Sequence, residues 1–238
     1  MIDNVMSMDG IMYGLSGLLL SANSIVIGIR FILRGRYTKQ SIMFLLAAGV
    51  ILLSAAWWPS SLTFLGISLP EWIFVRFAAI FFVPGLIVLN HGIAKAYNAS
   101  KVVQVATYII SLPILILVIF LPDLSVYITM VDGVKGVNYK FICGLLLFVN
   151  ILFTMWNTAW RFLSYGMRER SIEAKTKGIV TGIGFMIWAA MAIIDAITDY
   201  ISVLVIVRII MIFAQYLVLL GQISPEKLSR VLFHEESQ

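Results

Sequence analysis

Five charged side chains lie within or at the ends of long apolar stretches, where a charge must be paired or put to use. They are Glu71, Arg76, Asp195, Asp199 and Arg208. Near the centre of a bilayer a charged side chain costs about 2.5–3.5 kcal/mol on insertion scales. Asp195 and Asp199 are four residues apart, which places both on one face of a helix. We therefore expect the five to converge, either as an ion-pair network that locks the helices or as a pocket for a small polar or anionic ligand.

Amide side chains form a second polar set inside the apolar stretches. Asn150 and Asn157 follow helical spacing with Thr154 and Arg161, so all four share one predicted face. Interhelical hydrogen bonds of such groups contribute about 0.6 kcal/mol each on average. The amides therefore fit either helix packing or a polar track for protons or solute, whose members are Asn23, Asn90, Asn150, Asn157 and Gln215.

The residue pattern does not predict catalysis or metal binding. Cys143 is the only cysteine and falls in an apolar stretch, which argues against a disulfide framework and a thiolate metal site. His91 and His234 are far apart, and the hydroxyl groups of the apolar stretches have no histidine partner in the pattern. We therefore expect no catalytic residues, no metal and no cofactor, in a protein that is not an enzyme.

Seven long apolar stretches must position these groups. Hydrophobic residues make up 61% of the chain and charged residues 12%, whereas soluble domains are about 25% charged. A bilayer core about 30 Å thick needs about 20 apolar residues per helix, and continuous runs of this length exclude the short alternating strands of a barrel. The sequence predicts a single domain, 1–238, which is an all-α, multi-pass protein of the cell membrane. Its seven spans are expected at 10–33, 41–59, 71–92, 102–121, 140–163, 178–198 and 201–222.

Lysine and arginine are distributed unevenly between the connections of these spans. Because short cytoplasmic loops are rich in both residues, we expect the amino terminus outside and the carboxyl terminus in the cytoplasm. The net charge of +5 reflects this bias, and we do not interpret it as nucleic-acid binding. Trp57, Trp58 and Trp72 suit an aromatic belt at the outer interface. The outer connections hold only Lys135 and Lys140, and the cytoplasmic ones hold Arg30, Arg34, Arg36, Lys39, Lys95, Lys101, Arg161, Arg168, Arg170, Lys175, Lys177, Lys227 and Arg230.

Two segments outside the spans have structural signals of their own. The β-rich run Ser125–Val131 is followed by Asp132-Gly133, which suits a type I′ turn, and Val134–Tyr139 can return as a second strand. The outer segment 122–139 therefore forms either a β-hairpin lid or an irregular structured loop. After the last span, apolar and basic residues alternate in a pattern that predicts an amphipathic helix at 224–235 on the inner membrane surface.

The first three and last three spans share a faint internal repeat. Arg30-Phe31 at the inner end of span one recurs as Arg161-Phe162 in span five, and Trp57 of span two recurs as Trp188 of span six at the same spacing. This pattern favours a three-plus-one-plus-three arrangement, in which the two sets of three spans are related by an axis along the membrane normal. Chance alignment of apolar sequences is the alternative.

The third and sixth predicted spans are similar to those of the microbial rhodopsins. That family carries an Arg-aromatic-Ala-Asp-Trp run in its third span, then a proline and a second acid. Here the run reads Arg76-Phe77-Ala78-Ala79-Ile80 and is followed by Pro84 and Asn90. In span six, Ile187-Trp188-Ala189-Ala190-Met191-Ala192 resembles the family's Leu-Trp-Ser-Ala-Tyr-Pro. The resemblance implies a seven-helix scaffold that keeps Arg76 and Trp188, and we add Trp188 to the candidate ligand-binding residues.

The same resemblance shows which family features this chain lacks. When span seven is aligned through Leu217-Val218-Leu219-Leu220, the retinal-bearing lysine falls on Ile212 and the preceding aspartate on Arg208. No span interior contains a lysine, so a retinal Schiff base cannot form, and Ala79 cannot act as its counter-ion. The resemblance therefore implies an opsin-like bundle without retinal.

These patterns together predict a non-retinal, opsin-like receptor or sensor with an outward-facing pocket. The basic segment Arg161–Lys177 would then present the signal to a cytoplasmic signalling protein, although contact with anionic lipid also accounts for its charge. A transporter for a small solute or ion and a structural subunit of a membrane complex are the alternatives. The expected partners are the lipid bilayer, a small polar or anionic ligand and a signalling protein; homo-oligomers are possible and nucleic acid is not expected. The ligand-binding residues would be Glu71, Arg76, Trp188, Asp195, Asp199 and Arg208.

Overall fold

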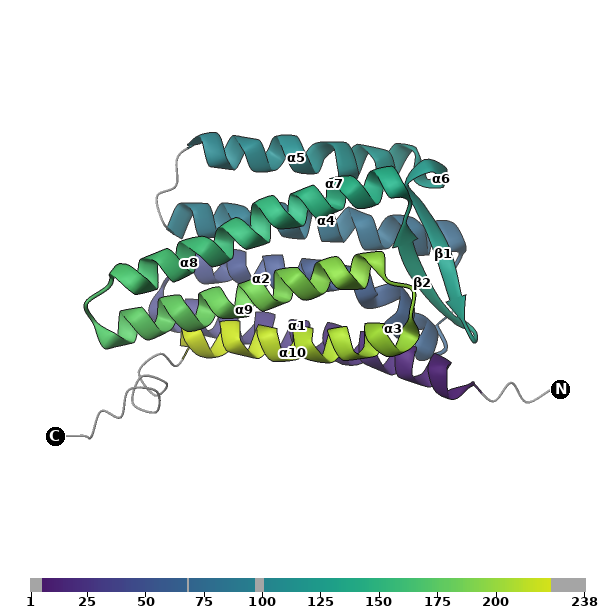
Figure 1. The fold of residues 1–238 in the computed structure, drawn as a ribbon, viewed down its shortest axis with the longest axis horizontal. Coiled ribbons are helices and arrows are strands. Elements are labelled where there is room, and N and C mark those ends of the chain that lie inside the picture. The colour runs from purple at the N-terminus through teal and green to yellow at the C-terminus, as the bar shows by residue number, and fades with distance from the viewer. Residues whose placement is uncertain (1–5, 68, 97–100, 224–238) are drawn as a thin grey trace.

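The chain forms a bundle of long helices with a β-hairpin across one end, which we call the hairpin end (Figure 1). The structure, a computed structural model, describes residues 6–67, 69–96 and 101–223, so the helix predicted at 224–235 lies outside it. The helices are α1 (Met8–Thr38), α2 (Ser41–Leu53), α3 (Trp58–Phe64), α4 (Glu71–Ala96), α5 (Lys101–Phe120), α6 (Pro122–Ser125), α7 (Phe141–Ile151), α8 (Asn157–Arg168), α9 (Ile172–Ile197) and α10 (Ile201–Ile223). The other elements are the 3-10 segment η1 (Ser54–Trp57), the strands β1 (Val126–Val131) and β2 (Val134–Tyr139), and the π-helical segment η2 (Leu152–Trp156).

Five helical segments of the described residues are long and apolar enough to cross a membrane. In α4 and α5 the apolar stretches are shorter, at Ile80–Gly92 and Val105–Phe120. The structure therefore has the helical, apolar character that the sequence predicts for a membrane-embedded protein. The five segments are Met8–Thr38, Ser41–Phe64, Phe141–Arg168, Ile172–Ile197 and Ile201–Gln222.

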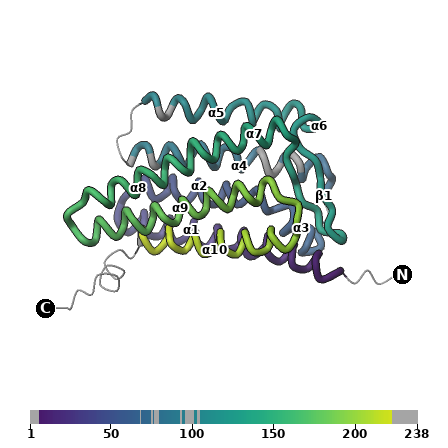
Figure 2. Tube along the Cα trace, in the orientation of Figure 1, coloured from purple at the N-terminus to yellow at the C-terminus, as the bar shows by residue number. Residues whose placement is uncertain are grey.

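The long helices pack side by side in a closed ring. The chain passes from α1 to α2, α4, α5, α7, α8, α9 and α10 through successive contacts, and α10 returns to α1 (Figure 2). The first and last helices of the ring are thus neighbours although they are far apart in the sequence. Large apolar side chains fill the interior, where Leu20, Phe31 and Ile114 are each 0% exposed.

Serine caps fix the start of two of the long helices. Ser7 precedes α1 and its hydroxyl oxygen accepts a hydrogen bond from the N–H of Gly10, while Asp9 lies in the first turn. Ser171 accepts in the same way from Ala174 at the start of α9. Each cap satisfies an N–H group that the helix itself leaves unpaired, and Asp9 interacts favourably with the helix dipole.

Two of the predicted spans are not continuous α-helices. The second runs on to Phe64 but tightens to 3-10 geometry in η1, because Pro59 has no N–H to donate to the carbonyl group one turn earlier. The fifth contains a π-helical turn at η2, which holds one extra residue and rotates all later side chains relative to earlier ones. The prediction that Asn150 and Asn157 share one face is therefore wrong, because it assumed constant α-helical spacing.

The segment between α6 and α7 forms a β-hairpin. The strands pair antiparallel with Val131 opposite Val134. The two residues between them, Asp132 and Gly133, have φ angles of 45° and 86°, and a type I′ turn requires positive φ at both positions. The structure thus has the hairpin, one of the two alternatives that the sequence left open, and Ser125 belongs to the short helix α6 and not to the strand.

Helix α1 holds the hairpin against the bundle. Ser7 donates a hydrogen bond to the carboxylate of Asp132 in the turn. Gly136 of β2 lies so close to Tyr13 of α1 that a Cβ added there would collide with the tyrosine hydroxyl. Val134 and Tyr13 are 0% and 5% exposed in this contact. The hairpin is therefore packed onto the helix ends and does not extend freely from them.

A pair of glycines brings α8 and α9 into backbone contact. A Cβ built on Gly178 would lie 2.5 Å from the Cα of Gly166. A Cβ on Gly182 would lie 2.9 Å from the carbonyl oxygen of Ala159. Both distances are shorter than real Cβ contacts, so only glycine fits, and small residues allow close approach of this kind between membrane helices.

Replacing Gly178 with alanine is expected to destabilise the protein by about 1–3 kcal/mol, because the added methyl group forces the two backbones apart. Gly144→Ala in α7 is the matched control, since a Cβ there meets nothing closer than 3.8 Å and alanine favours the helix. The midpoint of thermal unfolding in detergent measures both changes. Equal midpoints for the two variants would contradict the close contact of α8 with α9.

Candidate functional site

A cavity lies beneath the hairpin, between the helix ends. Its volume is about 60 Å³, which corresponds to about four to six water molecules at ~10–15 Å³ each. The hairpin end of the cavity is polar and its walls become apolar toward the middle of the bundle. The polar residues include Trp57, Asn138, Tyr139, Asp195 and Arg208, and the apolar ones include Phe82, Ile151, Met155 and Trp188.

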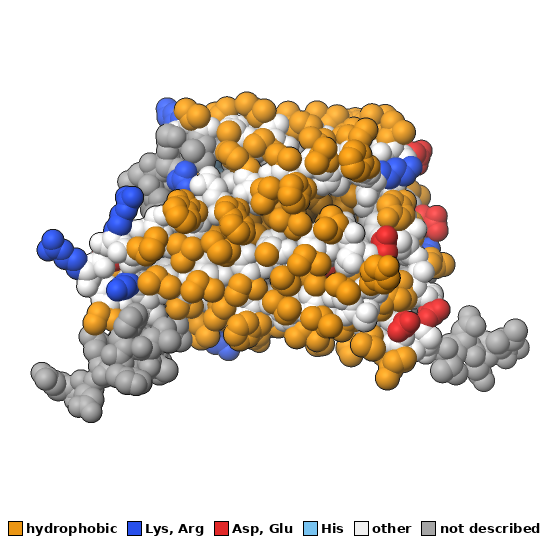
Figure 3. Space-filling model, in the orientation of Figure 1, with side chains coloured by type: hydrophobic (Ala, Val, Ile, Leu, Met, Phe, Trp, Pro, Cys, Tyr) orange, Lys and Arg blue, Asp and Glu red, His pale blue; other side chains and the backbone are white. Residues whose placement is uncertain are grey.

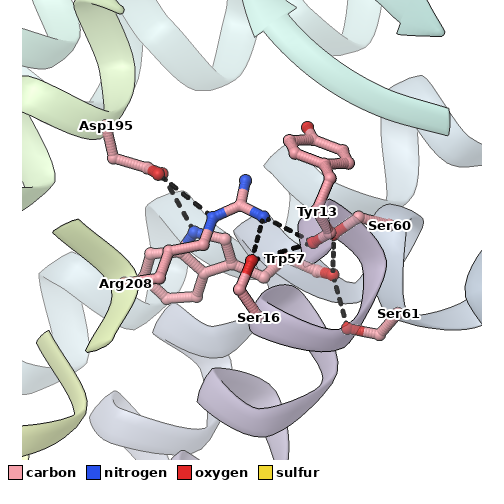
Figure 4. Close-up of polar contacts among 7 residues, drawn as sticks. All are labelled: Tyr13, Ser16, Trp57, Ser60, Ser61, Asp195 and Arg208. Atoms are coloured by element: carbon pink, nitrogen blue, oxygen red, sulfur yellow. Dashed lines mark hydrogen bonds and ion pairs between the residues drawn. The ribbon is translucent and has the colours of Figure 1, made fainter. Parts of the chain in front are cut away.

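A buried ion pair joins α9 to α10 at the polar end of the cavity (Figure 4). Nε of Arg208 donates to Oδ1 of Asp195 at 3.2 Å, and the two side chains are 5% and 16% exposed. The other carboxylate oxygen, Oδ2, accepts a hydrogen bond from the indole N–H of Trp57 at 3.0 Å. Both carboxylate oxygens are therefore engaged, and the two formal charges cancel.

The remaining guanidinium nitrogens of Arg208 have different surroundings. Nη1 donates to the carbonyl oxygen of Tyr13 at 3.0 Å and to the hydroxyl of Ser16 at 3.2 Å. The guanidinium carbon lies 4.5 Å from the centre of the Tyr13 ring, in a cation–π contact. Nη2 makes none of these hydrogen bonds; Figure 4 shows it between Asp195 and Tyr13, and the Tyr13 side chain also interacts with the guanidinium. Nη2 is therefore the guanidinium nitrogen with the fewest of these contacts to the described residues, and it belongs to a residue that lines the cavity.

Local backbone features place these partners around Arg208. A Cβ on Gly17 of α1 would lie 2.4 Å from the hydroxyl of Ser60 in α3 and 3.6 Å from Nη1 of Arg208, so glycine lets α1 approach both. Trp57 ends η1, two residues before Pro59, and is only 5% exposed. The prediction that Trp57 joins an outer aromatic belt is therefore wrong, because the Asp195 carboxylate accepts its indole N–H inside the bundle.

Tyr139 adds a second donor to the polar end. It is the last residue of β2 and lines the cavity. Within residues 6–67, 69–96 and 101–223 its hydroxyl has no hydrogen-bond partner. Burial raises the pKa of Tyr139 above its ordinary value, and the neighbouring Cys143 and Asp195 raise it further. The phenol therefore stays neutral at physiological pH and can donate its proton in a hydrogen bond.

An aromatic stack leads from the apolar part of the cavity to α8. Trp188, which lines the cavity and is 2% exposed, stacks on Phe185 with ring centres 6.0 Å apart and planes 15° from parallel. Phe185 stacks in turn on Phe162 of α8 at 5.8 Å. The cavity is therefore in packed contact, through two ring pairs, with the helix that leads to the opposite end of the bundle.

Two of the predicted site residues, Arg76 and Glu71, lie apart from the ion pair. Arg76 is exposed, and it lines a separate surface pocket together with Glu71 and residues of β1. Glu71 pairs with Lys135 of the hairpin at 3.6 Å. The expected convergence of five charges is therefore wrong. The side chain of Arg76 points out of the bundle, whereas the carboxylate that compensates Arg208 comes from Asp195 alone.

Asp199 is also separated from Asp195, which the sequence placed on the same helix face. Helix α9 ends at Ile197, so the four-residue helical spacing no longer holds. The exposed carboxylate of Asp199 accepts a hydrogen bond from the side chain of Asn138 in β2 at 3.1 Å. Asp199 therefore fastens the rim of the cavity to the hairpin and does not touch Arg208.

The predicted amides of α1, α8 and α10 form local contacts. Asn23 of α1 donates to Gln215 of α10 at 2.7 Å, and the amide nitrogen of Gln215 donates to Ser24 at 2.8 Å. Asn157 accepts a hydrogen bond from Arg161 of its own helix at 3.1 Å. The first two bonds cross between the first and last helices, so they close the ring.

The other two amides both bind hydroxyls of α5. Asn90 of α4 donates to Thr107, and Asn150 of α7 donates to Ser111 at 2.7 Å. Thr107 and Ser111 are one helical turn apart and therefore share one face of α5. Through this face α5 is bonded to both α4 and α7. Four of the five predicted amides thus lie in separate interhelical contacts and Asn157 bonds within its own helix, which fits a packing role better than a single track.

Several residues of the site were not predicted from the sequence. Tyr13 binds Arg208 through its backbone carbonyl group, which no sequence pattern marks. Tyr139 was assigned only to a strand. The sequence did contain a signal for Trp57 as a site residue. The internal repeat related it to Trp188, and both residues line the cavity.

Replacing Asp195 with alanine is expected to destabilise the protein by about 3–5 kcal/mol, because it leaves the Arg208 charge buried without a partner. Adding Arg208→Leu removes that charge and should restore most of the loss. Asp199→Ala is the control and should change stability by less than about 0.5 kcal/mol, since its carboxylate is exposed. Thermal unfolding of the parent protein, the single variants Asp195→Ala and Arg208→Leu, the double variant and the control measures the coupling. Additive losses in the double variant would show that the two charges do not stabilise each other.

The geometry defines what the site can do chemically. A compensated ion pair, two hydrogen-bond donors without acceptors and an apolar wall can hold a small molecule by polar and apolar contacts together. In the described residues no group of His, Cys, Asp or Glu side chains could hold a metal ion. Comparisons of the chain with protein-family models, with curated proteins and with solved structures find no match.

Proposed function

We propose that this protein is an opsin-like membrane receptor or sensor without retinal, and that the cavity beneath the hairpin binds a small ligand from outside the cell. In this proposal the chain crosses the cell membrane seven times, with the amino terminus outside and the carboxyl terminus in the cytoplasm. Helices α4 and α5 supply the two spans beyond the five long apolar segments. Spans one to three and five to seven are the two halves of a three-plus-one-plus-three arrangement.

The distribution of charge supports this orientation. Figure 3 shows acidic side chains gathered at the hairpin end and most of the basic ones at the end where α8 and α9 join. That second end carries Arg168 at the end of α8, Arg170 of the α8–α9 connection and Lys175 in the first turn of α9. Since cytoplasmic loops are rich in lysine and arginine, the hairpin end is the outer one in this proposal.

The single observation that carries the proposal is the unpaired donor of Arg208 inside a cavity. A guanidinium group within a membrane bundle is costly, and its donors are normally satisfied by the protein. Here the protein satisfies Nε and Nη1 and leaves Nη2 at the cavity. This arrangement supports a ligand that completes the coordination of the arginine.

The π-helical segment η2 is the proposed link between the cavity and the cytoplasm. Ile151 and Met155, directly before and within η2, line the cavity. Beyond η2 the chain continues as α8, whose Phe162 also receives the aromatic stack from Trp188. A π turn holds one residue more than an α turn, so a shift of the extra residue along the helix changes the rotation of α8. Ligand contact at Met155 would bias this shift and move the basic α8–α9 connection that meets the signalling protein.

A distance measurement between spin labels tests the proposal. The labels are placed at Arg170→Cys in the α8–α9 connection and Arg36→Cys in the last turn of α1, both exposed, in a Cys143→Ser background. Butyramide, butyrate and butylamine are added at saturating concentration as probes of three charge types. At least one is expected to change the distance by a few ångströms, because α8 rotates relative to α1. Uptake of a probe into proteoliposomes without any distance change would instead support the transporter alternative.

Deleting Phe153 from η2 is expected to convert the π turn to a continuous α-helix, because it removes the extra residue. The deletion should keep probe binding at the cavity but abolish the change in label distance. Phe153→Ala, which keeps the residue count, is the matched control and should retain the response. A deletion variant that binds and responds like the parent protein would contradict the role proposed for η2.

A further inference from the structure

We infer that the ligand of this cavity is a small uncharged molecule with a carbonyl-type oxygen at one end and a short apolar body at the other. The inference rests on the proposed function and narrows its ligand, since the sequence pattern allowed polar and anionic compounds alike. It is carried by three features of the cavity. They are its charge balance, its two unpaired donors, and the apolar character and size of its inner part.

The cavity has no positive charge left over for an anion. Of the residues that line it, Arg208 and Asp195 are the only charged ones, and they form an ion pair. Lys135, on the nearby strand, pairs with Glu71, and Asp199 at the rim adds a further negative charge through Asn138. An anion in the cavity would therefore be an uncompensated buried charge, whose desolvation costs several kcal/mol as an order of magnitude.

A cation is also disfavoured, because it would lie beside the positively charged guanidinium of Arg208, whose counter-ion Asp195 is already engaged. Both oxygens of Asp195 already accept hydrogen bonds, from Arg208 and from Trp57. At the polar end of the cavity, Nη2 of Arg208 and the hydroxyl of Tyr139 make none of the hydrogen bonds described above; the guanidinium can only donate, whereas the phenol oxygen and the amide oxygen of Asn138 can also accept. An ammonium group would be repelled by this guanidinium, and it would gain neutral acceptors such as the amide oxygen of Asn138 but no free carboxylate.

A neutral carbonyl oxygen satisfies both donors without adding charge. Such an oxygen has two lone pairs and can accept two hydrogen bonds. One would come from the arginine of α10 and the other from the tyrosine that ends β2, so a bound ligand would bridge the hairpin and the bundle. Hydrogen bonds from charged donors contribute about 1.5–3 kcal/mol, more than bonds between neutral groups.

The apolar inner wall of the cavity determines the size and polarity of the other end of the ligand. Ile151, Met155 and Trp188 are 2%, 3% and 2% exposed, and they present only hydrocarbon, sulfur and ring surface to the cavity apart from the indole N–H. The volume of about 60 Å³ holds about four to six non-hydrogen atoms if each takes the place of one water molecule. A primary amide with a short alkyl chain matches this size and polarity.

The experiment compares butyramide with its charged analogues butyrate and butylamine on the purified, full-length protein in nanodiscs. Binding is followed by ligand-detected NMR and by tryptophan fluorescence, because Trp57 and Trp188 both line the cavity. Butyramide is expected to bind at least about tenfold more tightly than either ion, which corresponds to about 1.4 kcal/mol. Tighter binding of butyrate or butylamine would overturn the inference, as would the absence of any butyramide binding.

Two variants make the test specific to the proposed contacts. Tyr139→Phe removes one donor and should weaken butyramide binding about fivefold, whereas Tyr127→Phe, on the exposed face of β1, should leave it unchanged. Asp195→Asn leaves the Arg208 charge uncompensated and should shift the preference toward butyrate. Equal effects of the two tyrosine variants would contradict the site even if Asp195→Asn does not fold.

The outcome separates this inference from the proposed function. If butyramide binds through Tyr139 but the spin-label distance does not change, the ligand class stands and the sensor role fails. If only butyrate or butylamine binds and changes the distance, the sensor role stands and the ligand class inferred here is wrong.

Discussion

The ion pair between Arg208 and Asp195 is the constraint on which the rest of the site depends. A guanidinium group cannot be withdrawn from water unless its charge and most of its donors are satisfied. Here the requirement brings three other parts of the chain to Arg208 of α10. Helix α9 supplies the carboxylate, η1 supplies the indole that orients it, and α1 supplies a carbonyl group and a ring face. The same contacts close the ring between its first and last helices, next to the amide bond from Asn23 to Gln215.

Departures from regular helix geometry shape the cavity around this pair. The 3-10 segment before Pro59 carries Trp57 into the bundle, and the π turn at η2 places Met155 on the cavity wall. Neither departure adds stability in itself, since both replace standard α-helical hydrogen bonds with weaker geometry. Their effect is to place the side chains of Trp57 and Met155 at the cavity. Both occur at the level of the cavity, which supports the interpretation that this is the functional part of the molecule.

How far the sequence could predict this structure depended on whether the deciding interactions were local. The hairpin was predictable because Asp132-Gly133 fits only a few turn types, and the apolar helices followed from run length alone. The pairing of the charges was not predictable. Arg76 and Arg208 look alike in the sequence. Only the packing of the helices leaves Arg76 exposed and Arg208 buried. The end of α9 two residues before Asp199 likewise removed a spacing that a longer helix would have kept.

The contact between Gly136 and Tyr13 makes the hairpin part of the electrostatics of the site. The tyrosine ring has Arg208 on its face and the backbone of β2 against its hydroxyl. In the proposed function, a movement of β2 away from α1 would expose the tyrosine ring that covers the guanidinium. Water there would raise the local dielectric constant around the ion pair and weaken it. Under that proposal, exposure of the cavity and weakening of the ion pair would occur together, so a ligand would meet the arginine at its most accessible and would be enclosed as β2 returns to α1.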